Sequence, residues 1–146
     1  MTSGTSPTID IKGNCFWYRD KRFHRDNDLP AIELTDGSRY WYDHGQRHRN
    51  NGLPAVMNKS GSRYWYINDS SHRDNDLPAV IFANGDRAWC VRGRYHRDQG
   101  LPAQICVNGD RLWYVHGKLH RDGGLPAVEL ADGRREWWVN GQRAPQ

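Results

Sequence analysis

The sequence repeats itself every 24 residues, without insertion or deletion. Six tryptophans and five histidines keep this register: Trp17, Trp41, Trp65, Trp89, Trp113 and Trp137, and His24, His48, His72, His96 and His120. A fixed period of this length indicates a repeat architecture, in which each unit buries its apolar face against its neighbours. We expect these tryptophans and histidines to be structural.

The period sets the expected domain organisation, which is a single repeat domain over residues 1–146. Residues 1–23 form an N-terminal cap with a truncated repeat, and residues 144–146 form a tail. Between them lie five full repeats, at 24–47, 48–71, 72–95, 96–119 and 120–143.

Each repeat has the pattern of a β-hairpin. In the third repeat, residues 79–83 and 87–91 are expected to be strands, joined by a two-residue turn at Asn84-Gly85. Asn-Gly favours a type I′ turn, which needs positive φ at both central residues. A second turn follows at Arg92-Gly93, and a short third strand leads to the next histidine. No segment has helical periodicity, so the chain is expected to be nearly all β.

The turns predict which side chains share a face. With Asp36-Gly37 as a two-residue loop, Arg39 lies opposite Leu34 and Trp41 lies opposite Ile32. With His44-Gly45 as the second loop, Trp41 also lies opposite His48. Tryptophan, an aliphatic residue and histidine then share one face. The other face carries Tyr40, Tyr42, Ala31 and Glu33.

Two architectures fit these hairpins. In a β-solenoid, equivalent residues would stack at about 4.8 Å, and the recurrent arginines would form a repulsive column of like charge. In an antiparallel meander, each repeat adds two strands, and equivalent residues lie roughly 10 Å apart. We therefore predict an elongated, twisted, single-layer meander of about six hairpin repeats, with the β-solenoid as the alternative.

Composition explains what fills such a sheet. Leu, Ile, Val and Phe together account for 25 of the 146 residues, or about 17%, which is a level typical of disordered chains. Seven tryptophans and seven tyrosines argue against disorder. The sequence therefore predicts a thin fold that is braced by aromatic rings.

Several features bear on the compartment. Cys15, Cys90 and Cys106 are odd in number and lack the C-x-x-C spacing, which favours reduced thiols. No apolar run approaches the roughly 18 residues of a membrane span, and the first seven residues lack a secretory signal. We expect a cytoplasmic protein with no transmembrane segment.

One known family has a similar unit. The pattern G-x-R-x-W-Y-V-x-G, followed by histidine, resembles the MORN repeat in a variant form, and Gly109, Trp113, Tyr114, Gly117 and His120 carry the resemblance. The resemblance covers about residues 7–143. MORN units usually have glycine after the histidine, whereas arginine follows here and Leu-Pro-Ala intervenes. In this respect the chain looks closer to repeats of large DNA viruses, phages and some bacteria. The resemblance implies a sheet that serves as a binding or assembly scaffold.

Catalysis, cofactors and metals are not expected. Enzyme sites are usually unique constellations, whereas His-Arg-Asp or His-Arg-Asn occurs five times here. Equivalent histidines roughly 10 Å apart cannot share one zinc ion, whose ligand bonds are about 2 Å long. We therefore predict no catalytic, cofactor-binding or metal-binding residue.

A macromolecular partner, most plausibly a protein, is the preferred hypothesis. Tyrosine, tryptophan and arginine are enriched at protein interfaces, and the candidate partner-binding residues are Tyr40, Tyr42, Tyr64, Tyr66, Tyr114, Trp138, Arg49, Arg73 and Arg97. The viral and phage resemblance extends this to the hypothesis of an inhibitor of a host protein. One alternative is end-to-end self-assembly through unpaired strand edges. A second is a nucleic-acid or nucleotide binder that uses the arginine and aromatic columns.

Overall fold

The computed structural model describes residues 6–145. In this part of the chain there are 24 strands of two residues each and no helix, which confirms the predicted all-β class. Accordingly, no helix there has the length and hydrophobicity that a membrane span requires. The chain divides into two compact units, residues 1–70 and 71–146, which are described separately below.

Six strands of each unit form an antiparallel meander. In the first unit the strand order is β1 (Thr8–Ile9), β2 (Cys15–Phe16), β5 (Ile32–Glu33), β6 (Arg39–Tyr40), β9 (Val56–Met57) and β10 (Arg63–Tyr64). In the second unit it is β13 (Val80–Ile81), β14 (Arg87–Ala88), β17 (Gln104–Ile105), β18 (Arg111–Leu112), β21 (Val128–Glu129) and β22 (Arg135–Glu136).

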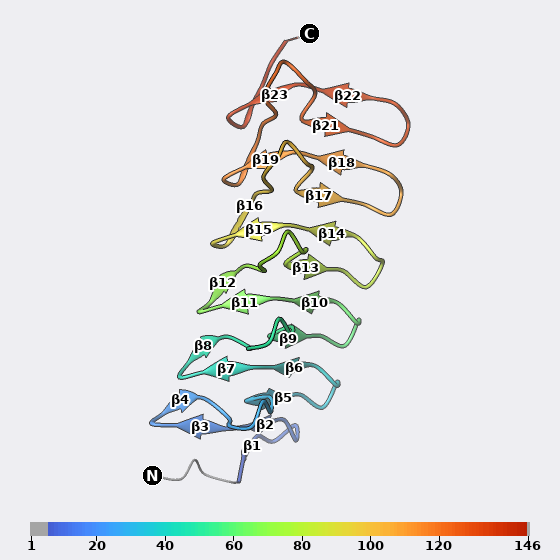
Figure 1. Ribbon diagram of the computed structural model, residues 1–146. Coiled ribbons are helices and arrows are strands. Elements are labelled where there is room, and N and C mark those ends of the chain that lie inside the picture. Colours follow the sequence, from blue (N-terminus) through green and yellow to red (C-terminus); the bar gives the residue numbers. More distant parts are fainter. Residues whose placement is uncertain (1–5, 146) are drawn as a thin grey trace. The chain divides into compact units, whose positions relative to one another are not determined.

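The remaining strands belong to small two-stranded hairpins, one in each repeat (Figure 1). They are β3 (Tyr18–Arg19), β4 (Arg22–Phe23), β7 (Tyr42–Asp43), β8 (Gln46–Arg47), β11 (Tyr66–Ile67), β12 (Ser70–Ser71), β15 (Cys90–Val91), β16 (Arg94–Tyr95), β19 (Tyr114–Val115), β20 (Lys118–Leu119), β23 (Trp138–Val139) and β24 (Gln142–Arg143). In each unit the small hairpins lie along one side and the loops of the meander along the other (Figure 1).

Pairing between successive repeats decides between the two predicted architectures. Strand β6 pairs with β9 of the next repeat in the antiparallel sense, and β14 pairs with β17 in the same way. A β-solenoid would place equivalent strands of successive repeats in direct parallel contact. The antiparallel pairing confirms the meander, in which equivalent residues of successive repeats lie two strand spacings apart.

The first turn of each repeat differs from the prediction. Phe82 N–H donates to the Asp86 carbonyl (2.9 Å), which leaves Ala83, Asn84 and Gly85 as a three-residue loop. Of the three, only Gly85 has positive φ, at 93°. This is the common three-residue hairpin loop, a type I turn followed by a left-handed glycine. The predicted two-residue type I′ turn is wrong here, because Asn84 stays in the ordinary backbone region.

The second turn matches its prediction. His44 (φ 47°) and Gly45 (φ 89°) are both left-handed, as a type I′ turn requires. Strands β7 and β8 pair Asp43 with Gln46. His48 N–H donates to the Trp41 carbonyl (3.2 Å), so the expected pairing of these two residues is confirmed.

The extra residue in the first turn shifts the register by one and changes the faces. Arg39 lies opposite Glu33, and Tyr40 lies opposite Ile32. The predicted pairs Arg39–Leu34 and Trp41–Ile32 are therefore wrong, because a shift of one residue moves every side chain to the other face.

The shift also brings tryptophan beside alanine. Trp41 N–H donates to the Ala55 carbonyl at 2.8 Å, and Trp89 N–H donates to Ala103 in the same way. At this bond the chain passes from the meander into a small hairpin. The predicted strand 87–91 is therefore interrupted at Trp89 and is divided into β14 and β15. Likewise, only Val80 and Ile81 of the predicted strand 79–83 are paired.

One tryptophan and one alanine per repeat form the core. Trp17, Trp41, Trp65, Trp89 and Trp113 are 5–7% exposed, and the alanines at 31, 55, 79, 103 and 127 are completely buried. Trp137 is only half-buried. Valine joins this core at Val56, Val80 and Val128. The low aliphatic content of the sequence thus reflects a core in which indole rings fill the space between repeats.

We predict that Trp89→Ala lowers the free energy of unfolding by about 3–5 kcal/mol, because it removes a buried indole ring from a core that cannot collapse around the gap. Urea unfolding followed by circular dichroism measures the loss. Trp137→Ala is the matched control and should cost clearly less, since that ring is half-exposed. Equal losses in the two variants would contradict this account of the core.

Candidate functional site

A third turn, which was not predicted from the sequence, anchors the indole ring of five tryptophans. Leu29 N–H bonds to the Asp26 carbonyl (3.3 Å), and both central residues, Asn27 and Asp28, have positive φ. The Asp28 carbonyl then accepts the indole N–H of Trp41 at 3.0 Å. The same bond recurs in four later repeats at 2.7–3.0 Å. The dipeptides Asn-Asp and Asn-Gly at this place in the sequence predict such a turn, because these residues tolerate positive φ.

An arginine eight residues after the tryptophan stacks on the indole ring in four places. The guanidinium carbon lies 3.6–3.9 Å from the ring centroid for the pairs Arg25–Trp17, Arg49–Trp41, Arg97–Trp89 and Arg121–Trp113. At this distance the cation is attracted to the electron-rich ring face.

Each stacked arginine is also neutralised by a carboxylate. Arg49 donates two hydrogen bonds to Asp28 at 2.8 and 2.7 Å, and Arg97 does the same with the equivalent Asp76. Arg121 faces a glycine at that loop position and instead donates to Glu129 at 2.8 Å. Arg25 pairs in the same way, with Glu33. Either the preceding loop or the following strand supplies the acid.

The candidate residues Arg49 and Arg97 are therefore held inside the repeats. Their side chains are only 14% and 13% exposed. They line clefts of about 250 and 230 Å³ at equivalent places in the two units. Arg73, at the equivalent position, donates to the Pro78 carbonyl at 3.4 Å, as Arg49 does to the Pro54 carbonyl. These contacts indicate that the arginines of this column stabilise the fold.

Four of the candidate aromatic residues lie in the small hairpins and contact neighbouring side chains. The Tyr42 ring lies 5.2 Å from Phe23, and the Tyr114 ring lies 5.2 Å from Tyr95. The Arg47 guanidinium lies 4.2 Å from the Tyr66 ring. Burial raises the pKa of Tyr42 and of Tyr114 above the ordinary value. In the last repeat, the indole N–H of Trp138 donates to Glu136.

The other two candidates, Tyr40 and Tyr64, lie in the meander of the first unit. Both are paired with Val56, one from each side. Directly opposite residues share a face, so these two rings flank one valine. The structure thus separates the candidate aromatic residues into two groups, one in the meander and one in the small hairpins.

The opposite face of each meander carries a row of exposed arginines. We call these the arginine rows, and they consist of Arg39 and Arg63 in the first unit and of Arg87, Arg111 and Arg135 in the second. Met57 lies between the first pair, and Ile105 lies between Arg87 and Arg111. Glu129 follows between Arg111 and Arg135. Strand spacing puts successive arginines about 10 Å apart.

These arginines differ from the stacked ones in their charge balance. Within residues 6–145, no ion pair involves any of them. The nearest acids in the rows, Glu33 and Glu129, are already bound to the stacked Arg25 and Arg121. The rows are therefore positively charged surface without a bound counter-charge. They are not among the site residues predicted from the sequence.

Comparison with known proteins gives no family: no family model matches the chain, and no curated protein is similar to it. What the structure shows is a series of 24-residue units, each built from two β-hairpins. The resemblance to MORN repeats remains a prediction from the sequence motifs alone.

The paired aspartates predict a loss of stability in acid. Hydrogen bonds from Arg49 and Arg97 lower the pKa of Asp28 and of Asp76 from the ordinary value of an aspartate. A depressed pKa in the folded state contributes stability that is present above the unfolded pKa and is lost as the pH falls through the folded value.

An Asp28→Asn/Asp76→Asn variant should therefore lose less stability than the wild type between about pH 5 and pH 2. The difference is roughly 0.2–1 kcal/mol per pair, because both aspartates are half-exposed. Urea titrations across this range measure it, with the exposed Asp20→Asn as control. Parallel pH profiles for the wild type and the double variant would refute the pairing.

Proposed function

We propose that this protein is a non-catalytic repeat scaffold that binds a protein partner through the arginine rows. The observation that carries the proposal is the contrast between its two arginine columns. Stacked arginines are matched with carboxylates one by one, whereas the arginine rows are exposed and unpaired. Like charges repeated about 10 Å apart are only partly screened at physiological salt, so acidic groups on a partner would relieve their repulsion.

The chemistry of the rows favours a protein over a nucleic acid. Aliphatic side chains alternate with arginine at Met57, Ile81 and Ile105, and Met57 is 37% exposed. Arginine beside exposed apolar surface is typical of protein interfaces. Proteins that bind single-stranded nucleic acid instead interleave basic residues with aromatic rings on which bases stack. Here the tyrosines of the meander lie on the opposite face.

The distance between successive arginines predicts how acidic side chains are spaced on the partner. Arginines about 10 Å apart would meet an acidic side chain at about every seventh residue of an α-helix. Because the same polar arrangement recurs from repeat to repeat, binding energy would be spread over several similar contacts. This recurrence is also why we propose a scaffold, since an active site needs a single dedicated constellation.

The test reverses the charge of the row in the second unit. An Arg87→Glu/Arg111→Glu variant should lose most of a cross-linked protein partner captured from the native host, as quantified by mass spectrometry. Arg92→Glu/Lys118→Glu makes the same change of net charge in the small hairpins and should keep the partner. Both variants replace exposed side chains, and thermal unfolding would verify that each is folded.

Two outcomes would contradict the proposal. Equal capture by the row variant and by the control variant would show that the rows do not form the interface. Capture that disappears after nuclease treatment, together with binding of oligonucleotides that weakens steeply as salt rises, would assign the rows to nucleic acid instead.

A further inference from the structure

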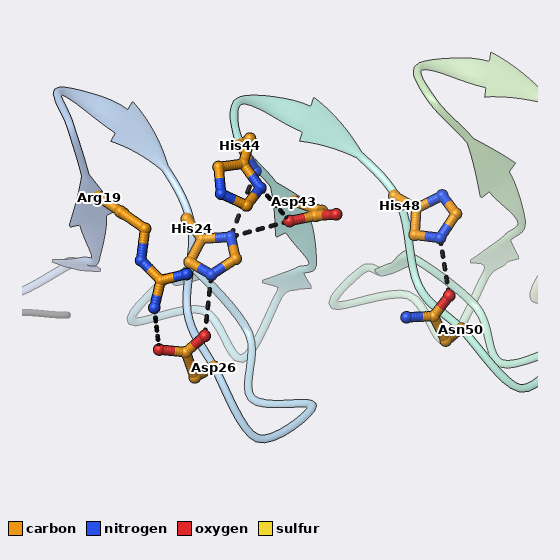
Figure 2. A network of polar contacts seen from close by, with 7 residues as sticks. All are labelled: Arg19, His24, Asp26, Asp43, His44, His48 and Asn50. Atoms are coloured by element: carbon orange, nitrogen blue, oxygen red, sulfur yellow. Dashed lines mark hydrogen bonds and ion pairs between the residues drawn. The ribbon is translucent and has the colours of Figure 1, made fainter. Parts of the chain in front are cut away.

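A cluster of two histidines and one aspartate lies within the first full repeat, where its first residue, His24, meets the turn between β7 and β8 (Figure 2). The turn between β7 and β8 brings Asp43 and His44 against the ring of His24, which is buried. Asp43 Oδ1 lies 3.0 Å from His24 Nδ1 and 2.5 Å from His44 Nδ1. The two imidazole centroids are 4.5 Å apart. Within residues 6–145, this is the one group of three His, Cys, Asp or Glu side chains whose potential metal-ligand atoms all lie within 4.8 Å of one another.

The cluster depends on Asp43, which distinguishes this repeat from the other repeat that has both histidines. In the second unit, His96 and His116 also lie 4.5 Å apart. There, however, Val115 stands at the position of Asp43, and valine or isoleucine occupies it in the other later repeats. The remaining full repeats have asparagine or arginine at the position of His44. Two repeats thus share the histidine pair, and in one of them Asp43 adds the carboxylate that completes a donor set.

Hydrogen bonding places two acceptor atoms of the cluster next to each other. His24 Nε2 lies 3.0 Å from Asp26 Oδ1, and His24 Nδ1 accepts the backbone N–H of His44 at 3.2 Å. An imidazole with its proton on Nε2 has only a lone pair on Nδ1. That lone pair also lies 3.0 Å from the carboxylate oxygen of Asp43. A proton on Nδ1 or a metal ion between the two atoms makes this contact favourable, and a metal ion at Nδ1 would replace the bond from the His44 N–H.

We propose that His24 Nδ1, Asp43 Oδ1 and His44 Nδ1 form a binding site for a divalent transition-metal ion, with zinc as the best match. Two imidazoles with one carboxylate suit zinc, nickel or copper, whereas calcium and magnesium prefer oxygen ligands throughout. Tetrahedral zinc, with bonds of about 2.0 Å, holds its ligand atoms about 3.3 Å apart. Small side-chain rotations reach this geometry, because Asp43 and His44 are 55% and 56% exposed.

The surroundings of His24 suit a metal ligand. Ligating histidines commonly donate the other ring N–H to a carboxylate, which fixes the tautomer and orients the ring. Asp26 takes this position and is itself bound by Arg19 (Figure 2). Similar histidine–aspartate contacts of 3.0–3.1 Å recur in later repeats, so the framework orients every histidine and Asp43 makes one of them a ligand. Three protein ligands leave a coordination position for water or for a donor from a partner.

The experiment is a calorimetric titration of the tag-free protein with zinc. We expect one ion per chain for the wild type and none for Asp43→Val, which copies the arrangement in the second unit. Because valine is the natural residue at the equivalent positions 91, 115 and 139, this variant should fold. The converse variant, Val115→Asp, should bind two ions per chain. Zinc should also raise the thermal unfolding temperature of the wild type but not that of Asp43→Val.

Cobalt distinguishes this site from the three free cysteines. Cobalt bound by two imidazoles and a carboxylate shows d–d bands without a thiolate-to-metal charge-transfer band. A charge-transfer band would assign the ion to a thiol and overturn the proposal. A wild-type protein that binds no zinc, an Asp43→Val variant that keeps its ion, or a Val115→Asp variant that still binds one would each overturn it as well.

Discussion

The fold depends on one tryptophan per repeat, because the backbone and the indole ring of this residue together contact three other segments of the chain. Trp41 illustrates this. Its backbone N–H binds Ala55 of the next repeat, and its carbonyl accepts the N–H of His48. The indole N–H binds the Asp28 carbonyl, and Arg49 covers the ring. Strands of two residues make few ladder bonds, so neighbouring repeats are joined chiefly through this residue and the alanine beside it.

The stacked arginine adds to the contacts of the tryptophan. It also explains why one column of arginines has carboxylate partners and the other does not. A guanidinium can lie on the ring, bind a carboxylate and donate to a proline carbonyl together, because its donors form a planar fork. Where Asp28 or Asp76 stands in the preceding loop, it neutralises the arginine, and where the loop lacks an acid, Glu129 does so from the strand. These acids are bound to the stacked arginines, whereas the arginines of the other column have no ion-pair partner within residues 6–145.

Repetition also shows how a regular framework acquires local chemistry. The paired rings of His24 and His44 have a counterpart in His96 and His116, and only the residue at position 43 separates a set of metal donors from an apolar contact. A single substitution in one repeat can therefore introduce a site while the backbone stays the same. The equivalent unsubstituted repeat then serves as an internal reference within the same molecule.

The sequence by itself determined the repeat length, the all-β class, the second turn and the aromatic nature of the core, because these follow from local dipeptides and from composition. It did not determine the register, because a third residue in the first turn reverses which side chains share a face, as at Arg39 and Glu33. Only the tertiary structure decided which arginines are neutralised and that His24 meets His44. Those contacts join residues about one repeat apart, and only the stacking of repeats sets them.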